Sequence, residues 1–202
     1  EVITEITKLG KVGHAFKADV SSAQETQVLH DELKKAFGKI DILINNAGVW
    51  DASPIEQISV DQYHRVFDVN VKGVIATTVA ALPLIPEGGR IVNISSVAAK
   101  SSMPGMSVYS ASKAALDALT RIWAQELGAR KITVNGVAPG TTVSDMFHAA
   151  IPADQHEGLS EKTALGRLGE PSDIAAVVAF LASADGAWIT GQTITADGGL
   201  NA

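Results

Sequence analysis

The fold is decided first by residues 40–48, which read IDILINNAG. Residues Ile40–Asn45 form a compact run rich in β-branched side chains, which is typical of a strand buried on both faces of a parallel sheet. Asn46, Ala47 and Gly48 then form a short polar turn with a glycine. Ligands of open α/β sheets bind beyond the carboxyl ends of the strands, so we expect this turn at a binding rim.

Strand and helix patterns alternate along the rest of the chain. Further strands are predicted at Val12–Ala18, Arg90–Ser95, Ile132–Ala138 and Gln192–Thr195. Helical patterns lie between them, at residues 2–9, 22–37, 59–85, 107–128 and 171–182. Alternation with long crossovers indicates an α/β fold, a doubly wound parallel sheet of Rossmann-like type with helices on both faces. Residues 141–169 have weak periodicity and predict a mobile lid over the substrate, with one or two short helices.

Composition narrows the function classes. The 202 residues suggest a single domain, 1–202, and the 46% hydrophobic and 19% charged fractions exclude intrinsic disorder. A net charge of −6 without basic blocks argues against nucleic-acid binding. No apolar run reaches the length of a membrane span and no signal peptide is visible, so we expect no membrane partner and a cytoplasmic location. The lack of cysteine excludes thiolate metal sites, and the histidines show no zinc-type spacing, so no metal is expected.

The first chemical signal is the pair Tyr109 and Lys113, four residues apart in a predicted helix. Side chains at this spacing lie on one face, one helical turn apart. A nearby ammonium favours the phenolate and can lower a tyrosine pKa by about 1–3 units, which would let Tyr109 exchange protons near neutral pH. The alternative is an ordinary Tyr–Lys pair on a solvated helix face.

Ser96 supplies a second signal, because it ends a predicted strand thirteen residues before Tyr109. Its hydroxyl could donate to a substrate oxygen opposite Tyr109. A simple turn or helix cap is the alternative role for such a serine.

Five ordered motifs together resemble the short-chain dehydrogenase/reductase family across nearly the whole chain. They are Asn45–Gly48, Asn70–Gly73, Ile94–Ser96, Tyr109–Lys113 and Pro139–Gly140, and the stretch from Gly166 to Gly199 is similar to the family as well.

The resemblance implies roles for individual residues. Tyr109 would be the general acid/base and would also contact the cofactor, Lys113 would lower its pKa and hold the nicotinamide ribose, and Ser96 would orient the substrate. Asn70 would sit at a helix irregularity and support a proton-relay water. The remaining implied contacts are all to the cofactor, NAD or NADP: Asp19 and Val20 at the adenine, Asn46, Ala47 and Gly48 at its ribose, and Pro139, Gly140, Thr142 and Ser144 at the nicotinamide.

The family's opening glycine-rich strand–turn–helix segment has no counterpart in these residues, so the fold is expected to be N-terminally incomplete. Either these residues are part of a complete enzyme that carries this segment, or the chain is truncated and binds the cofactor poorly. The residue that selects between NAD and NADP would lie in this segment, so the residues present do not indicate which of the two is used.

The function expected from the resemblance is hydride transfer between a nicotinamide cofactor and an alcohol or ketone. One alternative is a truncated non-catalytic relative that acts as a structural or regulatory subunit. Another is a halohydrin dehalogenase-like lyase, although that branch carries an arginine where this chain has Lys113. Small residues on the helices at 59–85 and 107–128 permit close helix approach, and the resemblance implies a homodimer or homotetramer.

Overall fold

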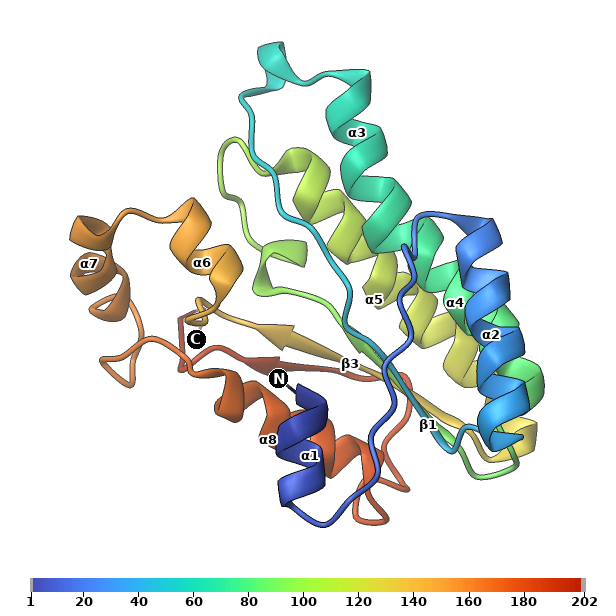
Figure 1. Cartoon of the computed structure of the whole chain (residues 1–202). Coiled ribbons are helices and arrows are strands. Elements are labelled where there is room, and N and C mark those ends of the chain that lie inside the picture. Colours follow the sequence, from blue (N-terminus) through green and yellow to red (C-terminus); the bar gives the residue numbers. More distant parts are fainter. Residues whose placement is uncertain (1, 201–202) are drawn as a thin grey trace.

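The computed structural model describes residues 2–200 and contains a four-stranded parallel sheet. The strands β1 (Ile42–Asn45), β2 (Arg90–Ile94), β3 (Thr133–Pro139) and β4 (Thr193–Ala196) lie in chain order. Because every neighbouring pair is parallel, each connection crosses over the sheet, and helices cover both faces (Figure 1). The predicted doubly wound α/β class is confirmed, as are the three later strands.

Helices begin and end where local chemistry predicts. Ser22 accepts a hydrogen bond from the backbone N of Glu25 at 3.2 Å and Ser59 accepts one from Gln62 at 3.0 Å, so both serines are N-caps. Pro171 opens a helix at a position where its missing N–H costs little. The α-helices are α1 (Val2–Lys8), α2 (Ala23–Phe37), α3 (Val60–Phe67), α4 (Val74–Ala81), α5 (Ser107–Leu127), α6 (Asp145–Ala150), α7 (His156–Ser160) and α8 (Pro171–Ala182). Short 3-10 turns lie at Ile55–Gln57, Leu82–Leu84, Val97–Ala99, Gly128–Arg130 and Ala153–Gln155.

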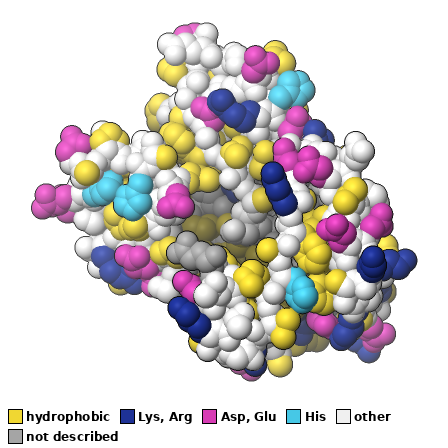
Figure 2. Space-filling view, in the orientation of Figure 1, with side chains coloured by type: hydrophobic (Ala, Val, Ile, Leu, Met, Phe, Trp, Pro, Cys, Tyr) yellow, Lys and Arg dark blue, Asp and Glu magenta, His cyan; other side chains and the backbone are white. Residues whose placement is uncertain are grey.

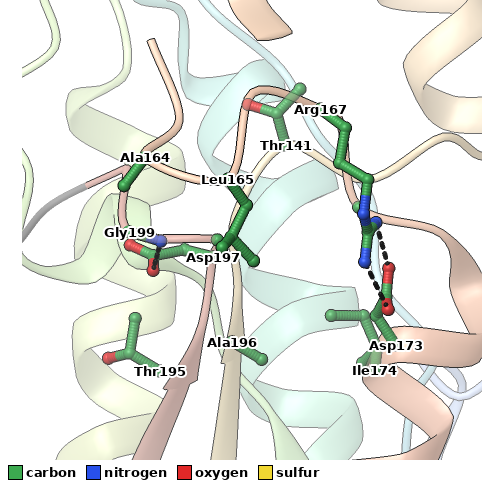
Figure 3. Close-up of a pocket in the computed structure, with 12 residues that line it drawn as sticks. Thr141, Ala164, Leu165, Arg167, Asp173, Ile174, Thr195, Ala196, Asp197 and Gly199 are labelled. Atoms are coloured by element: carbon green, nitrogen blue, oxygen red, sulfur yellow. Dashed lines mark hydrogen bonds and ion pairs between the residues drawn. The ribbon is translucent and has the colours of Figure 1, made fainter. Parts of the chain in front are cut away.

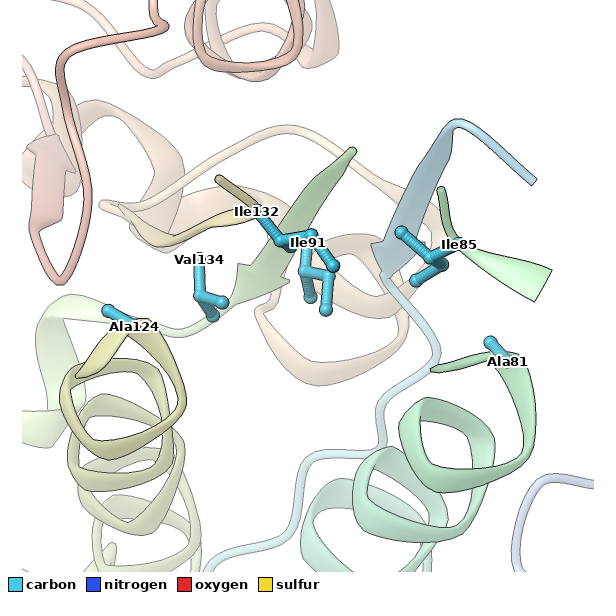
Figure 4. Packing of buried hydrophobic residues seen from close by; sticks show 6 residues of the cluster. All are labelled: Ala81, Ile85, Ile91, Ala124, Ile132 and Val134. Atoms are coloured by element: carbon cyan, nitrogen blue, oxygen red, sulfur yellow. The ribbon is translucent and has the colours of Figure 1, made fainter. Parts of the chain in front are cut away.

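The core lies on both faces of the sheet, because successive side chains of a strand point to opposite sides. On one face Ile91 and Val134 pair in register and pack with Ala81 of α4 and Ala124 of α5 (Figure 4). On the other face Val92 and Val137 pack against Leu181 of α8. These layers fix β2 and β3 between α5 and α8, with the carboxyl ends of the strands free for a site.

The predicted strand Val12–Ala18 is wrong, because residues 11–19 adopt no regular element in the part of the chain that the structure describes. A strand needs a neighbour for its backbone N–H and C=O groups, and β1 pairs only with β2 among the described strands. The segment is instead held by side chains. His14 and Phe16 pack against the ring of Phe37 at the end of α2.

Burial of the first strand on both faces is also a wrong expectation. Ile42 and Ile44 are 46% and 37% exposed, whereas Leu43 packs into the core from the opposite face. The reason is position: β1 is the edge strand, and α8 packs against β2, β3 and β4.

The predicted helix at 59–85 is helical without a break through residue 81, but its centre is not a regular α-helix. Between α3 and α4, residues Asp68–Gly73 form a π-helical segment, and Asn70 lies within it, fully buried. Such π segments inside α-helices are frequently found at functional sites. By length and composition alone Val60–Leu84 could also cross a membrane, a test that the core helix of a folded domain passes too.

Residues 141–169 contain α6, a 3-10 turn and α7, in agreement with the expected short helices. Histidine side chains gather over these helices (Figure 2), where the rings of His148 and His156 lie 5.9 Å apart beside Phe147. The molecular surface is hollowed between α6 and α3, with hydrophobic side chains at the rim (Figure 2). That this segment acts as a mobile lid stays a prediction.

Candidate active site

The predicted catalytic residues come together at the carboxyl ends of β1 and β2. Ser96 lies just beyond β2, and the following 3-10 turn leads to α5, which carries Tyr109 and Lys113. Asn70 reaches the same place from the π segment, through hydrogen bonds to the loop after β1 and to α5.

The side chain of Ser96 lies near enough to Tyr109 to lower the pKa of its hydroxyl. Ser96 also accepts a hydrogen bond from the backbone N of Ala98 at 3.1 Å, which fixes the hydroxyl at the strand end. Ser96 is therefore a cap of the turn, which was one of the two roles considered for it, and its hydrogen bond to a substrate oxygen stays a prediction.

The pKa of Tyr109 is raised, because its burial disfavours the phenolate, and the hydrogen bond from Ser96 opposes this effect. The expectation that Lys113 lowers this pKa is thus not met in the structure. The ammonium lies over the ring of Tyr109, with Nζ at 5.8 Å from the centroid. At neutral pH the tyrosine is a protonated donor.

Lys113 is 5% exposed, and its Nζ donates to the backbone oxygen of Ile94 at 2.9 Å. Burial disfavours the ammonium and lowers the pKa of Lys113 to about 8. An ammonium has three N–H donors. The bond to Ile94 uses one of them, so the others can bind a ligand in place of the water removed by burial.

Asn70 connects the π segment to the loop after β1. Its Oδ1 accepts from the backbone N of Val49 at 2.8 Å, and its Nδ2 donates to the backbone O of Val49 at 2.9 Å and to Oγ of Ser112 at 3.1 Å. Ser112 in turn donates to the backbone O of Tyr109 at 2.7 Å. The predicted helix irregularity at Asn70 is confirmed, and it ties the loop to the helix of Tyr109.

Gly48 lies between two of these residues. A Cβ placed on Gly48 would be 3.4 Å from Oδ1 of Asn70 and 3.5 Å from Nζ of Lys113. The absence of a side chain leaves bare backbone against the ammonium, which is the kind of surface that a ligand can approach closely.

The residues expected at the adenosine half divide into two groups. Val20, Asn46 and Ala47 line one small pocket of about 60 Å³ together with residues of β1 and the π segment. Asp19 is exposed, and its Oδ1 accepts from the N and Oγ of Ser21 at 2.9 and 2.7 Å. These bonds hold the pKa of Asp19 below its usual range. Asp19 is therefore a turn residue in this structure, and its contact with adenine stays a prediction.

The residues expected at the nicotinamide follow β3. The backbone N of Gly140 donates to Ala196 O at 2.9 Å, and a Cβ on Gly140 would lie only 2.6 Å from Cβ of Asp197, so only glycine fits. The hydroxyl of Thr142 donates to the backbone O of Gly140 at 3.1 Å. Ser144 caps α6 by accepting from the backbone N of Phe147 at 3.2 Å. Pro139 ends β3 itself.

A larger pocket of about 410 Å³ opens at the carboxyl ends of β3 and β4, beside α8, and was not predicted. Arg167 and Asp173 meet there through two bonds of 2.7 and 2.9 Å (Figure 3). The same carboxylate accepts from the backbone N of Glu170 at 2.8 Å and so caps α8. The pair is thus a structural clamp between the 141–169 segment and α8.

Sequence reasoning also missed Asp117, which is 5% exposed on α5. The signal was present: positions 109, 113, 117 and 120 recur at helical spacing, so Asp117 and Thr120 share the inward face of Tyr109 and Lys113. Thr120 accepts from Nδ2 of Asn93 at 2.9 Å, and Asn93 accepts from Asn45 at 2.8 Å. This chain of buried amides fixes α5 above β1 and β2.

Comparison with known proteins agrees with the resemblance that the sequence motifs indicate. The model of the enoyl-(acyl carrier protein) reductase family matches residues 1–201. An uncharacterized oxidoreductase of Methylorubrum extorquens is 45% identical over 201 residues, covering 98% of this chain and 81% of the relative. A short chain dehydrogenase/reductase of Aspergillus novofumigatus is 41% identical over 211 residues, which is 98% of this chain and 80% of the relative.

Solved structures agree closely with this fold. A dehydrogenase/reductase from Sinorhizobium meliloti superposes with a TM-score of 0.94 at 42% identity, over 100% of this chain and 79% of its own. A short chain dehydrogenase from Burkholderia cenocepacia, solved in complex with NADP, has a TM-score of 0.93 at 39% identity, over 100% of this chain and 82% of its own.

Proposed function

The chain belongs to the short-chain dehydrogenase/reductase family of NAD(P)-dependent oxidoreductases, and we propose that it interconverts an alcohol and a carbonyl compound with Tyr109 as the general acid/base. The observation that carries the proposal is the meeting of Tyr109, Ser96 and Lys113 at one place, with the Lys113 ammonium over the Tyr109 ring and the Ser96 side chain acting on the pKa of Tyr109. Two hydroxyl groups there converge on the space in which a substrate oxygen would lie.

In the direction of reduction, Tyr109 donates its phenolic proton to the carbonyl oxygen of the substrate. The nicotinamide cofactor, when bound, supplies the hydride to the carbonyl carbon. Ser96 donates a hydrogen bond to the same oxygen and orients it. The phenolate left on Tyr109 then takes a proton from solvent, which restores the phenol. The raised pKa of Tyr109 keeps it protonated before the reaction, as an acid requires.

The residues present fit a nicotinamide cofactor. Lys113 has a buried ammonium whose described hydrogen bond to Ile94 leaves donors for the ribose hydroxyls, and Gly48 presents bare backbone beside it. Val20, Asn46 and Ala47 share a pocket where we place the adenosine ribose. Asn70 holds the loop that carries Gly48, so its role is to keep this cradle in place.

The two other functions weighed from the sequence have less support. A halohydrin dehalogenase-like site would require an arginine beside the tyrosine, and this chain has Lys113. A non-catalytic subunit would not need a buried ammonium over the ring of a tyrosine, since burying a charge costs free energy.

The test is a fluorescence titration with NADPH and with NADH, followed by a panel of aromatic and aliphatic ketones. We expect saturable binding of at least one cofactor and ketone-dependent loss of its absorbance. Cofactor binding without turnover on any ketone or alcohol would favour the non-catalytic subunit. No binding of either cofactor would contradict the proposal.

We also propose that the chain works as a homodimer or homotetramer. Val79 of α4 and Ile122 of α5 are 63% and 57% exposed, on helices rich in small residues. Light scattering at micromolar concentration tests this, and a monomer would contradict it.

A further inference from the structure

Asp117 is a buried carboxylate one helical turn beyond Lys113, on the same face of α5. Aspartate is seldom buried unless it is paired. Here its Oδ1 accepts a hydrogen bond from Oγ1 of Thr193 in β4, at 3.1 Å. The carboxylate therefore occupies a built position between helix and sheet rather than a chance one.

The sheet makes room for this bond. Thr193 lies opposite Gly136 of β3 in the parallel register. A Cβ on Gly136 would be 2.7 Å from Oγ1 of Thr193, closer than two such atoms can approach. The glycine thus leaves the space in which the threonine hydroxyl points at Asp117.

Lys113 needs a counter-charge. The ammonium of Lys113 is buried, and its hydrogen-bond acceptor, the backbone O of Ile94, has no formal charge. Burial lowers the pKa of Lys113, and the negative charge of Asp117 opposes that effect. Tyr109, the other titratable group beside Lys113, has a raised pKa and is neutral at pH 7.

The charged residues of the other elements packed against α5 are either exposed or paired with other groups. In the π segment Asp68 pairs with Lys72 at 3.0 Å, and in α3 Asp61 is exposed while His64 lies 3.8 Å from Asp68. Arg65 pairs with Asp51, and Arg90 and Arg130 donate to backbone oxygens near the amino end of β2. Asp117 is the carboxylate that acts on Lys113.

We propose that Asp117, held by Thr193, is a positioning residue that keeps Lys113 in its ammonium form at the active site. The inference rests on the proposed role of Lys113 in catalysis, but the charge of Lys113 can be measured without cofactor or substrate. Asp117 acts through Lys113 and has no contact with the reacting atoms.

The experiment follows the lysine Cε and Hε resonances by NMR against pH in the full chain without cofactor, with Lys113 assigned by its loss in Lys113→Arg. In Asp117→Asn the pKa of Lys113 should fall by about one unit or more, since an opposite charge nearby has been removed. The matched control is Glu126→Gln, which removes a carboxylate from an exposed position of the same helix, and it should leave the pKa of Lys113 unchanged.

A second pair of variants keeps the carboxylate. Thr193→Val should lower the pKa of Lys113 by a smaller amount, because it removes the hydrogen bond that holds the Asp117 carboxylate in place, and Thr193→Ser should restore it. In the enzyme assay, Asp117→Asn should move the lysine-dependent limb of the pH–rate profile by the same shift as the NMR titration.

An unchanged pKa of Lys113 in both Asp117→Asn and Thr193→Val would overturn the inference, whatever the activity. A shifted pKa in a protein that transfers no hydride would support the inference while contradicting the proposed function, so the two failures are distinguishable.

Discussion

Asn70 binds both backbone polar atoms of Val49, accepting from its N at 2.8 Å and donating to its O at 2.9 Å. The amide of Asn70 thus bonds the backbone of the loop after β1 in the way that a neighbouring strand would. The π segment makes this possible, because its extra residue per turn shifts the fully buried Asn70 relative to the regular helices around it.

Asn70→Ala should lower the free energy of unfolding by about 2–4 kcal/mol, because it leaves the partly buried backbone groups of Val49 without partners and opens a space in the core. Urea unfolding measures the change. Asn70→Asp keeps an acceptor for the N of Val49 but sets a charged oxygen against the backbone O of Val49 in a buried site, so its loss should be at least as large. A change below about 0.5 kcal/mol in Asn70→Ala would show that the bridge is dispensable.

Gly48→Ala should leave the fold stable and weaken cofactor binding. Its added methyl would stand at ordinary contact distance, 3.4 Å from Asn70 and 3.5 Å from Lys113, and would fill the space beside the ammonium. We expect Kd for the preferred cofactor to rise about tenfold, equal to about 1.4 kcal/mol. Gly128→Ala, where a Cβ meets open space, should bind normally. Equal affinity in both variants would place the cofactor elsewhere.

Gly140→Ala should destabilise the protein. A Cβ there would lie 2.6 Å from Cβ and 2.7 Å from Cα of Asp197, so the strand-end backbone must move. Overpacking of this kind costs about 1–3 kcal/mol, measured as a lower midpoint in thermal unfolding. An unaltered midpoint would mean that β3 and the chain after β4 separate more easily than their packing indicates.

The sequence predicted the elements that local pattern governs. Two kinds of feature could be predicted without tertiary information: the apolar runs of β2 and β3, and the serine caps of α2 and α3. A continuous apolar run indicates burial on both faces, and a serine before a helical pattern indicates a cap. Val12–Ala18 shows the limit: its apolar pattern suits a strand, yet strand formation depends on a neighbour, which a single run of residues does not reveal.

The site was predictable by motif and not by electrostatics. Tyr109, Ser96, Lys113 and Asn70 were expected together, and the structure brings them together. The direction of the tyrosine pKa was not predictable, because it depends on how deeply the ring is buried. Asp117 was missed since its importance comes from Thr193, a residue 76 positions away in sequence.

Asp173 should make stability sensitive to acid. Arg167 holds the pKa of this carboxyl at about 2, below its ordinary value of about 3.9. Because the folded-state pKa is the lower one, the contribution is fully present above about pH 4 and is lost as the pH falls toward 2. The difference in thermal midpoint between the native chain and Asp173→Asn should therefore shrink across that window.

Asp185→Asn is the matched control, because it removes a carboxylate from the exposed loop after α8. It should change the midpoint little at any pH. A constant difference for Asp173→Asn between pH 2 and pH 5 would contradict the role of the Arg167–Asp173 pair.

The central claim is that Tyr109 transfers the proton, and Tyr109→Phe tests it most directly, with kcat and cofactor Kd measured side by side. The account predicts a kcat lowered by about a thousandfold or more, with the fold and the Kd unchanged, since only the phenolic hydroxyl is removed. A Tyr109→Phe variant that reduces the same ketone at a rate close to that of the native chain would contradict the account.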